Sequence, residues 1–80
     1  MIFLAITPEG LRKALEVASG LSYHIWCGSD AVSESDEAFR RVSRFNYPLK
    51  GAGKDVLEDA LGTIKEHHPN QIIWIEGYVV

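Results

Sequence analysis

The first ten residues, MIFLAITPEG, decide the fold, because an apolar run over residues 2–6 stops abruptly at a complete helix-start signal. An apolar run without polar alternation is typical of a strand that is buried on both faces. Thr7 supplies a capping oxygen, and Pro8 at the first helical position already has a suitable backbone angle. The stretch therefore predicts a strand, a turn and a helix, the junction found in parallel α/β domains.

The rest of the chain repeats this pattern. Apolar residues at helical spacing predict a first helix from Pro8 to about Ser19, stopped by Gly20, and a last helix from about Lys54 to His67. Aromatic and β-branched side chains predict strands at residues 22–27 and 71–75, and the second of these is apolar on both alternating faces. We therefore expect Trp26 and Trp74 to lie in the core.

The middle of the chain is the least patterned part. Residues 36–45 keep a helical period through Ala38, Val42 and Phe45, which predicts a helix there, capped by Ser33 or Ser35. Residues 46–53 contain Pro48 and two glycines and predict a connector.

These elements indicate a single small α/β domain over residues 1–80. We predict a three-stranded, mostly parallel sheet in the order 2-1-3 with helices on both faces. The alternative is an α+β ferredoxin-like sandwich, which needs a fourth strand within residues 42–49 and places all helices on one face. The helical period of residues 36–45 favours the parallel sheet.

The composition, with 46% hydrophobic and 24% charged residues, is that of a soluble globular protein. A net charge of −3 gives no overall field to attract nucleic acid or an anionic membrane. Cys27 is the only cysteine, so no internal disulfide forms, and neither a signal peptide nor a membrane-length apolar run occurs. We expect a cytoplasmic protein without cofactor or metal.

The carboxyl ends of parallel strands form the rim where such domains bind ligands. The amides that begin the first helix favour an anion, and Gly10 permits close approach, but the carboxylate of Glu9 occupies the position such an anion would take. The candidate ligand-binding residues on this rim are Thr7, Gly10, Ser29 and Glu76.

Other motifs predict little chemistry. The run Gly51-Ala52-Gly53-Lys54 lacks the spacing and the Ser or Thr of a phosphate-binding loop. Cys27 is expected to be a buried structural thiol, because His24 faces the other side of its strand and His67 and His68 lie at the opposite rim. Adjacent helical residues point about 100° apart, so these two histidines do not form a chelate.

A basic cluster offers a different surface. Arg40, Arg41 and Arg44 lie beside aromatic residues, so RNA or an acidic partner is a third candidate for binding here. Neighbouring acidic residues weaken that interpretation.

Residues 2–18, with an apolar strand, a Thr7-Pro8-x-Gly10 turn and a Leu/Ala helix, resemble the opening of the cobalamin-pathway ring-opening hydrolase family. The resemblance covers about a fifth of the chain, and those enzymes are much longer. It implies the strand-turn-helix junction and no activity or residue role.

The sequence assembles no recognisable catalytic constellation, so we expect a non-enzymatic interaction or regulatory module. The apolar end Tyr78-Val79-Val80 is expected either to cover the domain's own core or to add to the sheet of a second copy, and the second option predicts a homodimer through an edge strand. The alternative is a small-molecule or anion-binding protein that uses the rim.

Overall fold

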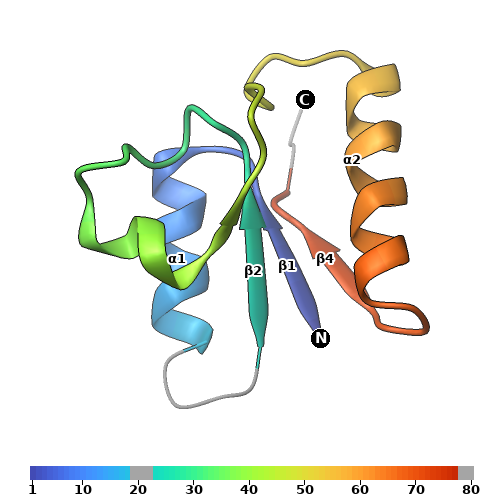
Figure 1. The fold of residues 1–80 in the computed structure, drawn as a ribbon, viewed down its shortest axis with the longest axis horizontal. Helices are drawn as coiled ribbons and strands as arrows, with labels where there is room; N and C mark the ends of the chain where they lie inside the picture. The colour runs from blue at the N-terminus through green and yellow to red at the C-terminus, as the bar shows by residue number, and fades with distance from the viewer. Residues whose placement is uncertain (19–22, 78–80) are drawn as a thin grey trace.

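The computed structural model describes residues 1–18 and 23–77, which form a parallel sheet with a helix on each face (Figure 1). Gly20, the predicted stop of the first helix, and Tyr78–Val80 lie outside the described residues. Within these ranges the elements are β1 (Ile2–Ala5), α1 (Pro8–Ala18), β2 (His24–Cys27), the 3-10 helix η1 (Glu37–Arg41), β3 (Ser43–Arg44), α2 (Lys54–His67) and β4 (Ile73–Ile75).

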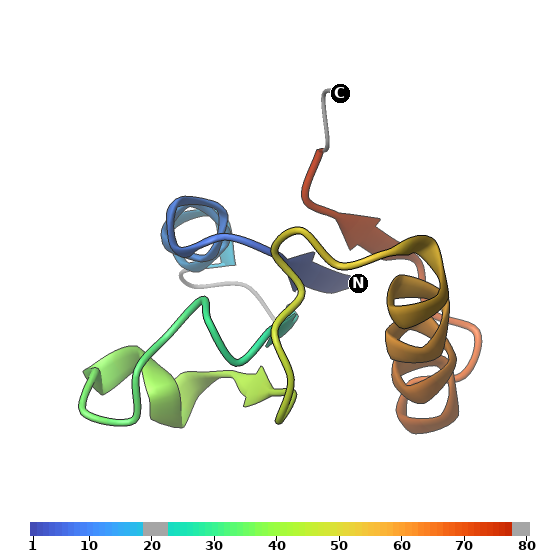
Figure 2. The ribbon, with the colours of Figure 1, turned by 90° about the horizontal axis from the view of Figure 1, so that it is seen from above.

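The strands are all parallel and lie in the order β3-β2-β1-β4. β1 lies between β2 and β4, as predicted, and Leu4 is in register with Trp26 on one side and Ile75 on the other. Figure 2 shows α1 and α2 on opposite faces of the sheet. The parallel α/β architecture is confirmed, whereas the prediction of three strands is wrong because β3 adds a fourth beside β2.

A separate hydrophobic core lies on each face of the sheet. Alternate residues of β1 point to opposite faces, so Leu4 packs on the α2 side and Ala5 on the α1 side. The α2-side cluster comprises Ile2, Leu4, Ile6, Phe45, Leu49, Ala60 and Ile64. The α1-side cluster comprises Ala5, Leu11, Ala14, Ile25, Cys27, Ala31 and Val32.

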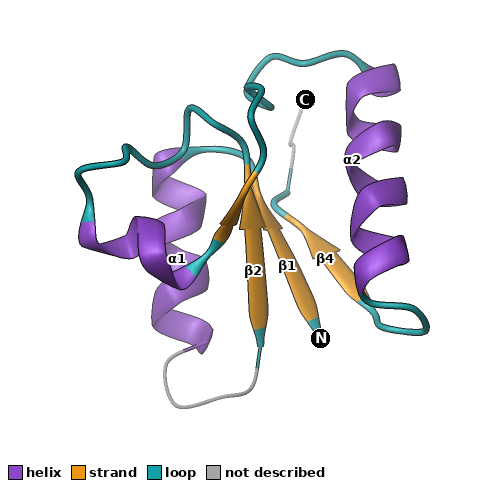
Figure 3. Cartoon of the chain, in the orientation of Figure 1, coloured by secondary structure: helices purple, strands orange, loops and turns teal. Residues whose placement is uncertain are grey.

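Residues 36–45 do not form the predicted helix (Figure 3). Asp36, rather than Ser33 or Ser35, caps the short η1 by accepting a hydrogen bond from the backbone N–H of Ala38 at 2.9 Å. The chain then extends, so Val42 packs on the α1 side and Phe45 on the α2 side. A helix would have placed both side chains on one face.

The ferredoxin-like alternative is also wrong. Its fourth strand does fall within residues 42–49, as β3, but β3 runs parallel to β2 and helices lie on both faces of the sheet. Among the described residues, no helix has the length and apolar character needed to span a membrane.

β4 departs most from expectation. The predicted order 2-1-3 already places this strand at an edge, and β4 does lie there, but the predicted burial on both faces is wrong. The exposed fractions are 68% for the preceding Ile72, 55% for Trp74 and 43% for Ile75. Trp26 does pack against the α2-side core, half-buried. The prediction that Trp74 is a core residue is therefore wrong.

Candidate functional site

The carboxylate of Glu76 lies on the amino-terminal end of α1. Its Oε1 accepts hydrogen bonds from the backbone N–H groups of Ile6 at 2.7 Å and Thr7 at 2.8 Å, and its Oε2 accepts one from the Thr7 hydroxyl at 2.6 Å. The Thr7 Oγ1 caps the helix, as predicted, by accepting from the N–H of Gly10 at 3.0 Å. We call this arrangement of Thr7, Gly10 and Glu76 the carboxylate clasp.

Two opposing effects act on the Glu76 carboxyl. Partial burial by itself would raise the pKa of Glu76, but hydrogen bonds from the Thr7 hydroxyl and from the backbone N–H groups of Thr7 and Ile6 outweigh it. The pKa of Glu76 is therefore lower than usual, and the carboxylate is held in its charged form. A Cβ at position 10 would overlap Oε1 of Glu76, so glycine is required for this close approach.

The clasp explains what became of the predicted anion site. Thr7, Gly10 and Glu76 do come together at the rim, but the Glu76 carboxylate itself takes the place of the anion. Glu9, which the sequence placed there, is exposed to solvent. An external anion at this helix end would have to displace Glu76.

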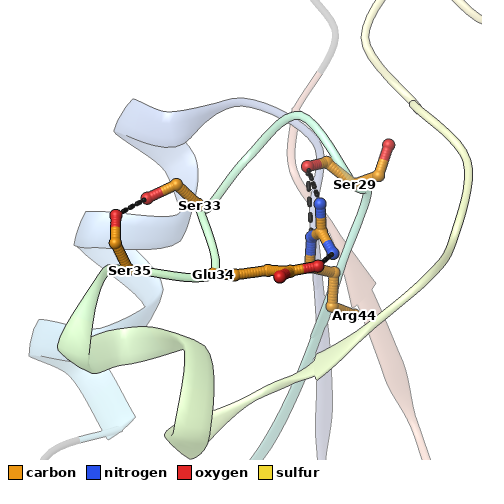
Figure 4. Close-up of polar contacts among 5 residues, drawn as sticks. All are labelled: Ser29, Ser33, Glu34, Ser35 and Arg44. Carbon is orange, nitrogen blue, oxygen red and sulfur yellow. Dashed lines mark hydrogen bonds and ion pairs between the residues drawn. The ribbon is translucent and has the colours of Figure 1, made fainter.

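Ser29, the fourth predicted rim residue, contacts a different group (Figure 4). Its carbonyl oxygen accepts two hydrogen bonds from Arg44, from Nε at 3.1 Å and Nη2 at 2.9 Å. The Arg44 guanidinium also lies 5.6 Å from the Phe39 ring centre and 3.7 Å from a Glu34 carboxylate oxygen. Arg44 thus fixes the loop after β2, and of the predicted basic cluster Arg40 and Arg41 remain exposed.

Cys27 is fully buried in the α1-side core. Burial raises the pKa of its thiol to about 11, while Arg44 lowers it and Asp30 raises it to smaller extents. A thiol with so high a pKa is almost entirely protonated at neutral pH and is a poor nucleophile.

A hollow with a largely apolar lining lies between α1 and β4. The pocket has a volume of about 230 Å³. α1 packs on β1 and β2 and leaves this face of β4 uncovered (Figure 2). The side chains of Val17 on α1 and of Trp74 on β4 are both about half exposed, at 54% and 55%. The pocket is lined by Phe3, Leu4, Ala5, Gly10, Lys13, Ala14, Val17, Trp74, Ile75 and Glu76.

Sequence reasoning missed this surface because it read the apolar run of residues 71–75 as a strand buried on both faces. The same run also fits an unprotected edge, and no signal within it separates the two. The outer edge of β4 and the adjoining pocket form the candidate functional site.

Comparisons with protein families, with curated proteins and with solved structures find no match for this chain. The resemblance of residues 2–18 to the hydrolase family stays a prediction.

Proposed function

We propose that this chain is an interaction module whose interface is the outer edge of β4 and whose partner is a second copy of the chain. The observation that supports this most is an exposed apolar edge strand that nothing shields among residues 1–18 and 23–77. Natural edge strands are shielded by charged residues, proline or bulges, and residues 72–75 read Ile-Ile-Trp-Ile.

The backbone of β4 has one side free for pairing. The carbonyl of Ile72 accepts from the N–H of Ile2 and the N–H of Glu76 donates to the carbonyl of Leu4, both at 2.9 Å. Because backbone groups alternate along a strand, those of Ile73 and Ile75 point away from β1. In the described part of the chain no further strand pairs with this edge.

Self-pairing satisfies these groups in a simple way. A two-fold axis at Trp74 would place Ile73 opposite the partner's Ile75, so that each pair exchanges two backbone hydrogen bonds in an antiparallel ladder. Trp74 would then face the partner's Trp74 on the same side of the sheet, which buries both indoles. Residues 72–75 carry no charge, so this alignment opposes no like charges within the strand.

The residues that flank β4 at both ends are bound to residues that flank β1. At its start the Met1 ammonium donates to Oε1 of Gln71 at 2.7 Å, and at its end Glu76 is held in the carboxylate clasp. An edge that is ordered before binding loses little conformational freedom when it pairs. This favours the β4 edge over the anion-binding rim and over the arginine surface, where Glu76 and Arg44 already have partners.

A pair of charge substitutions tests the two-fold axis. Trp74→Lys sets two ammonium groups opposite each other, so we expect self-association to weaken about tenfold or more, measured by light scattering over a dilution series. Trp74→Glu should do the same, and an equimolar mixture of the two variants should form dimers again. Val56→Lys is the control, because it introduces the same charge at an exposed apolar residue of α2. It should leave the dimer intact.

Ile75→Pro provides a second, backbone-directed variant. Proline removes an N–H that points away from β1, so the fold should survive while the ladder between copies is lost. A wild-type chain that stays monomeric at every concentration contradicts the proposal, as does a dimer that tolerates both Ile75→Pro and Trp74→Lys.

A further inference from the structure

A cluster of imidazole and aromatic rings joins the carboxyl-terminal end of α2 to the sheet, at the opposite end from the carboxylate clasp. The indole Nε1 of Trp26 on β2 donates a hydrogen bond to Nε2 of His68 at 3.2 Å. The ring of His24, also on β2, has its centre 4.8 Å from that of His68. The His24 Nε2 and the Ser43 Oγ of β3 are 2.7 Å apart.

The chemistry of the indole fixes the state of His68 in this contact. An indole N–H donates and never accepts, so Nε2 of His68 must offer its lone pair. A proton on Nε2 would set two donors against each other and place a positive charge beside His24. The contact between α2 and β2 therefore exists in this form only while His68 is neutral.

We propose that Trp26, His24 and His68 form a pH-sensitive latch, which holds the carboxyl-terminal end of α2 against β2 at neutral pH and releases it when Nε2 of His68 is protonated.

Several groups that can carry a positive charge lie around this cluster. The Met1 ammonium lies at the same end of the sheet, where the backbone N–H of His24 donates to the Met1 carbonyl at 3.3 Å. The ring of His67 lies 5.4 Å from that of Trp26 and adds a third imidazole. Among the described residues, the ion pairs join no carboxylate to any of these histidines.

The remaining neighbours do not titrate in the relevant range. The ring of Phe45 packs against that of Trp26, and the ring of Tyr47 packs against that of Phe45, both at a tilted angle. Burial and then Asp59 raise the pKa of Tyr47, so its phenol stays neutral at and below neutral pH. The imidazoles are thus the side chains of this cluster that can take up a proton.

His24 responds in the same direction. Partial desolvation, followed by repulsion from His68, lowers the pKa of His24 below its usual value of 6.5. The folded state therefore favours neutral His24, and the stability this gives is present above pH 6.5 and is lost as the pH falls through the lowered pKa. Protonation of His68 and protonation of His24 therefore both favour the open form of the latch.

Release would be local to the end of α2. The backbone N–H of His68 donates to the carbonyl of Ile64 at 2.8 Å and closes the last turn. The helix dipole favours a positive charge at this end, so protonation of His68 breaks the contact with β2 without unfolding the helix.

The test follows the Trp26 indole N–H resonance by NMR from pH 8 to pH 5, assigned with Trp74→Phe. We expect it to shift upfield as the hydrogen bond to His68 is lost. His68→Gln keeps a neutral acceptor that does not titrate, so this shift should disappear. His67→Gln is the matched control and should keep it.

Two outcomes overturn the latch. One is an indole resonance that does not change with pH. The other is a transition that persists in His68→Gln, with the folded state of that variant verified at pH 8 from its backbone spectrum. This readout does not depend on self-association, so the experiment tests the latch independently of the β4 interface.

Discussion

Gly10 is the residue on which the carboxylate clasp depends. It lies in the first turn of α1, where its N–H donates to the capping Thr7, and it leaves the space that the Glu76 carboxylate fills. Gly62, in the middle of α2, is also a helical glycine, but no atom lies near the position that a Cβ would take there. The two glycines therefore offer the same substitution in opposite surroundings.

We expect Gly10→Ala to destabilise the protein by about 1–2 kcal/mol. The added methyl group displaces the Glu76 carboxylate, and the loss of its charge-assisted hydrogen bonds outweighs the helix propensity gained. Gly62→Ala should instead stabilise by roughly 0.5–1 kcal/mol, because only the propensity changes. Urea unfolding of both variants measures the difference. Equal effects of the same sign would show that the clasp contributes nothing.

In the carboxylate clasp, one contact could be predicted from the sequence and the other could not. The capping role of Thr7 was predictable because it depends on the next three residues. The partner of that helix end was not, because Glu76 lies 69 positions from Thr7 and nothing local connects the two. Glu9 was the nearest carboxylate in sequence and was the wrong choice for the anion position.

At the scale of elements, the predicted β1, α1, β2, α2 and β4 are present. The two helices show a clear helical period, and the strands are short runs of apolar, aromatic or β-branched residues. The prediction of a helix over residues 36–45 was wrong. A five-residue 3-10 helix and a two-residue strand are too short to show a hydrophobic period of their own. β3 depends on a tertiary contact, the pairing of Trp26 with Ser43 and of Cys27 with Arg44. Such pairing cannot be read from local pattern.

Arg44 fixes this irregular segment, which distinguishes it from its neighbours in the basic cluster. Arg44→Ala removes two hydrogen bonds to the Ser29 carbonyl and the contact with Phe39, so we expect a loss of about 1–2 kcal/mol in the free energy of unfolding. Arg40→Ala, at an exposed position, should change it by less than about 0.5 kcal/mol. Denaturant titration compares them, and equal losses would rule out this structural role for Arg44.

At the scale of the whole molecule, titratable contacts lie at both ends of the sheet. The clasp joins the end of β4 to the start of α1, and the rings of Trp26 and His68 join β2 to the end of α2. One depends on an ionised carboxylate and the other on a neutral imidazole. Acid therefore weakens both contacts.

The acid limb of the stability curve should consequently depend on Glu76. Its folded-state pKa is lowered, so the stability it provides is complete above the usual carboxyl value of 4.5 and is lost as the pH falls through the folded-state pKa. Glu76→Gln should lower stability at neutral pH by about 1 kcal/mol, after allowance for solvent screening, and should flatten the curve below pH 4.5. Glu9→Gln makes the same change at an exposed position of α1 and should leave the slope intact. The test is urea unfolding of the wild type and Glu76→Gln at a series of pH values. If the free energy of unfolding falls with acid equally steeply in both, the clasp does not hold an ionised carboxylate.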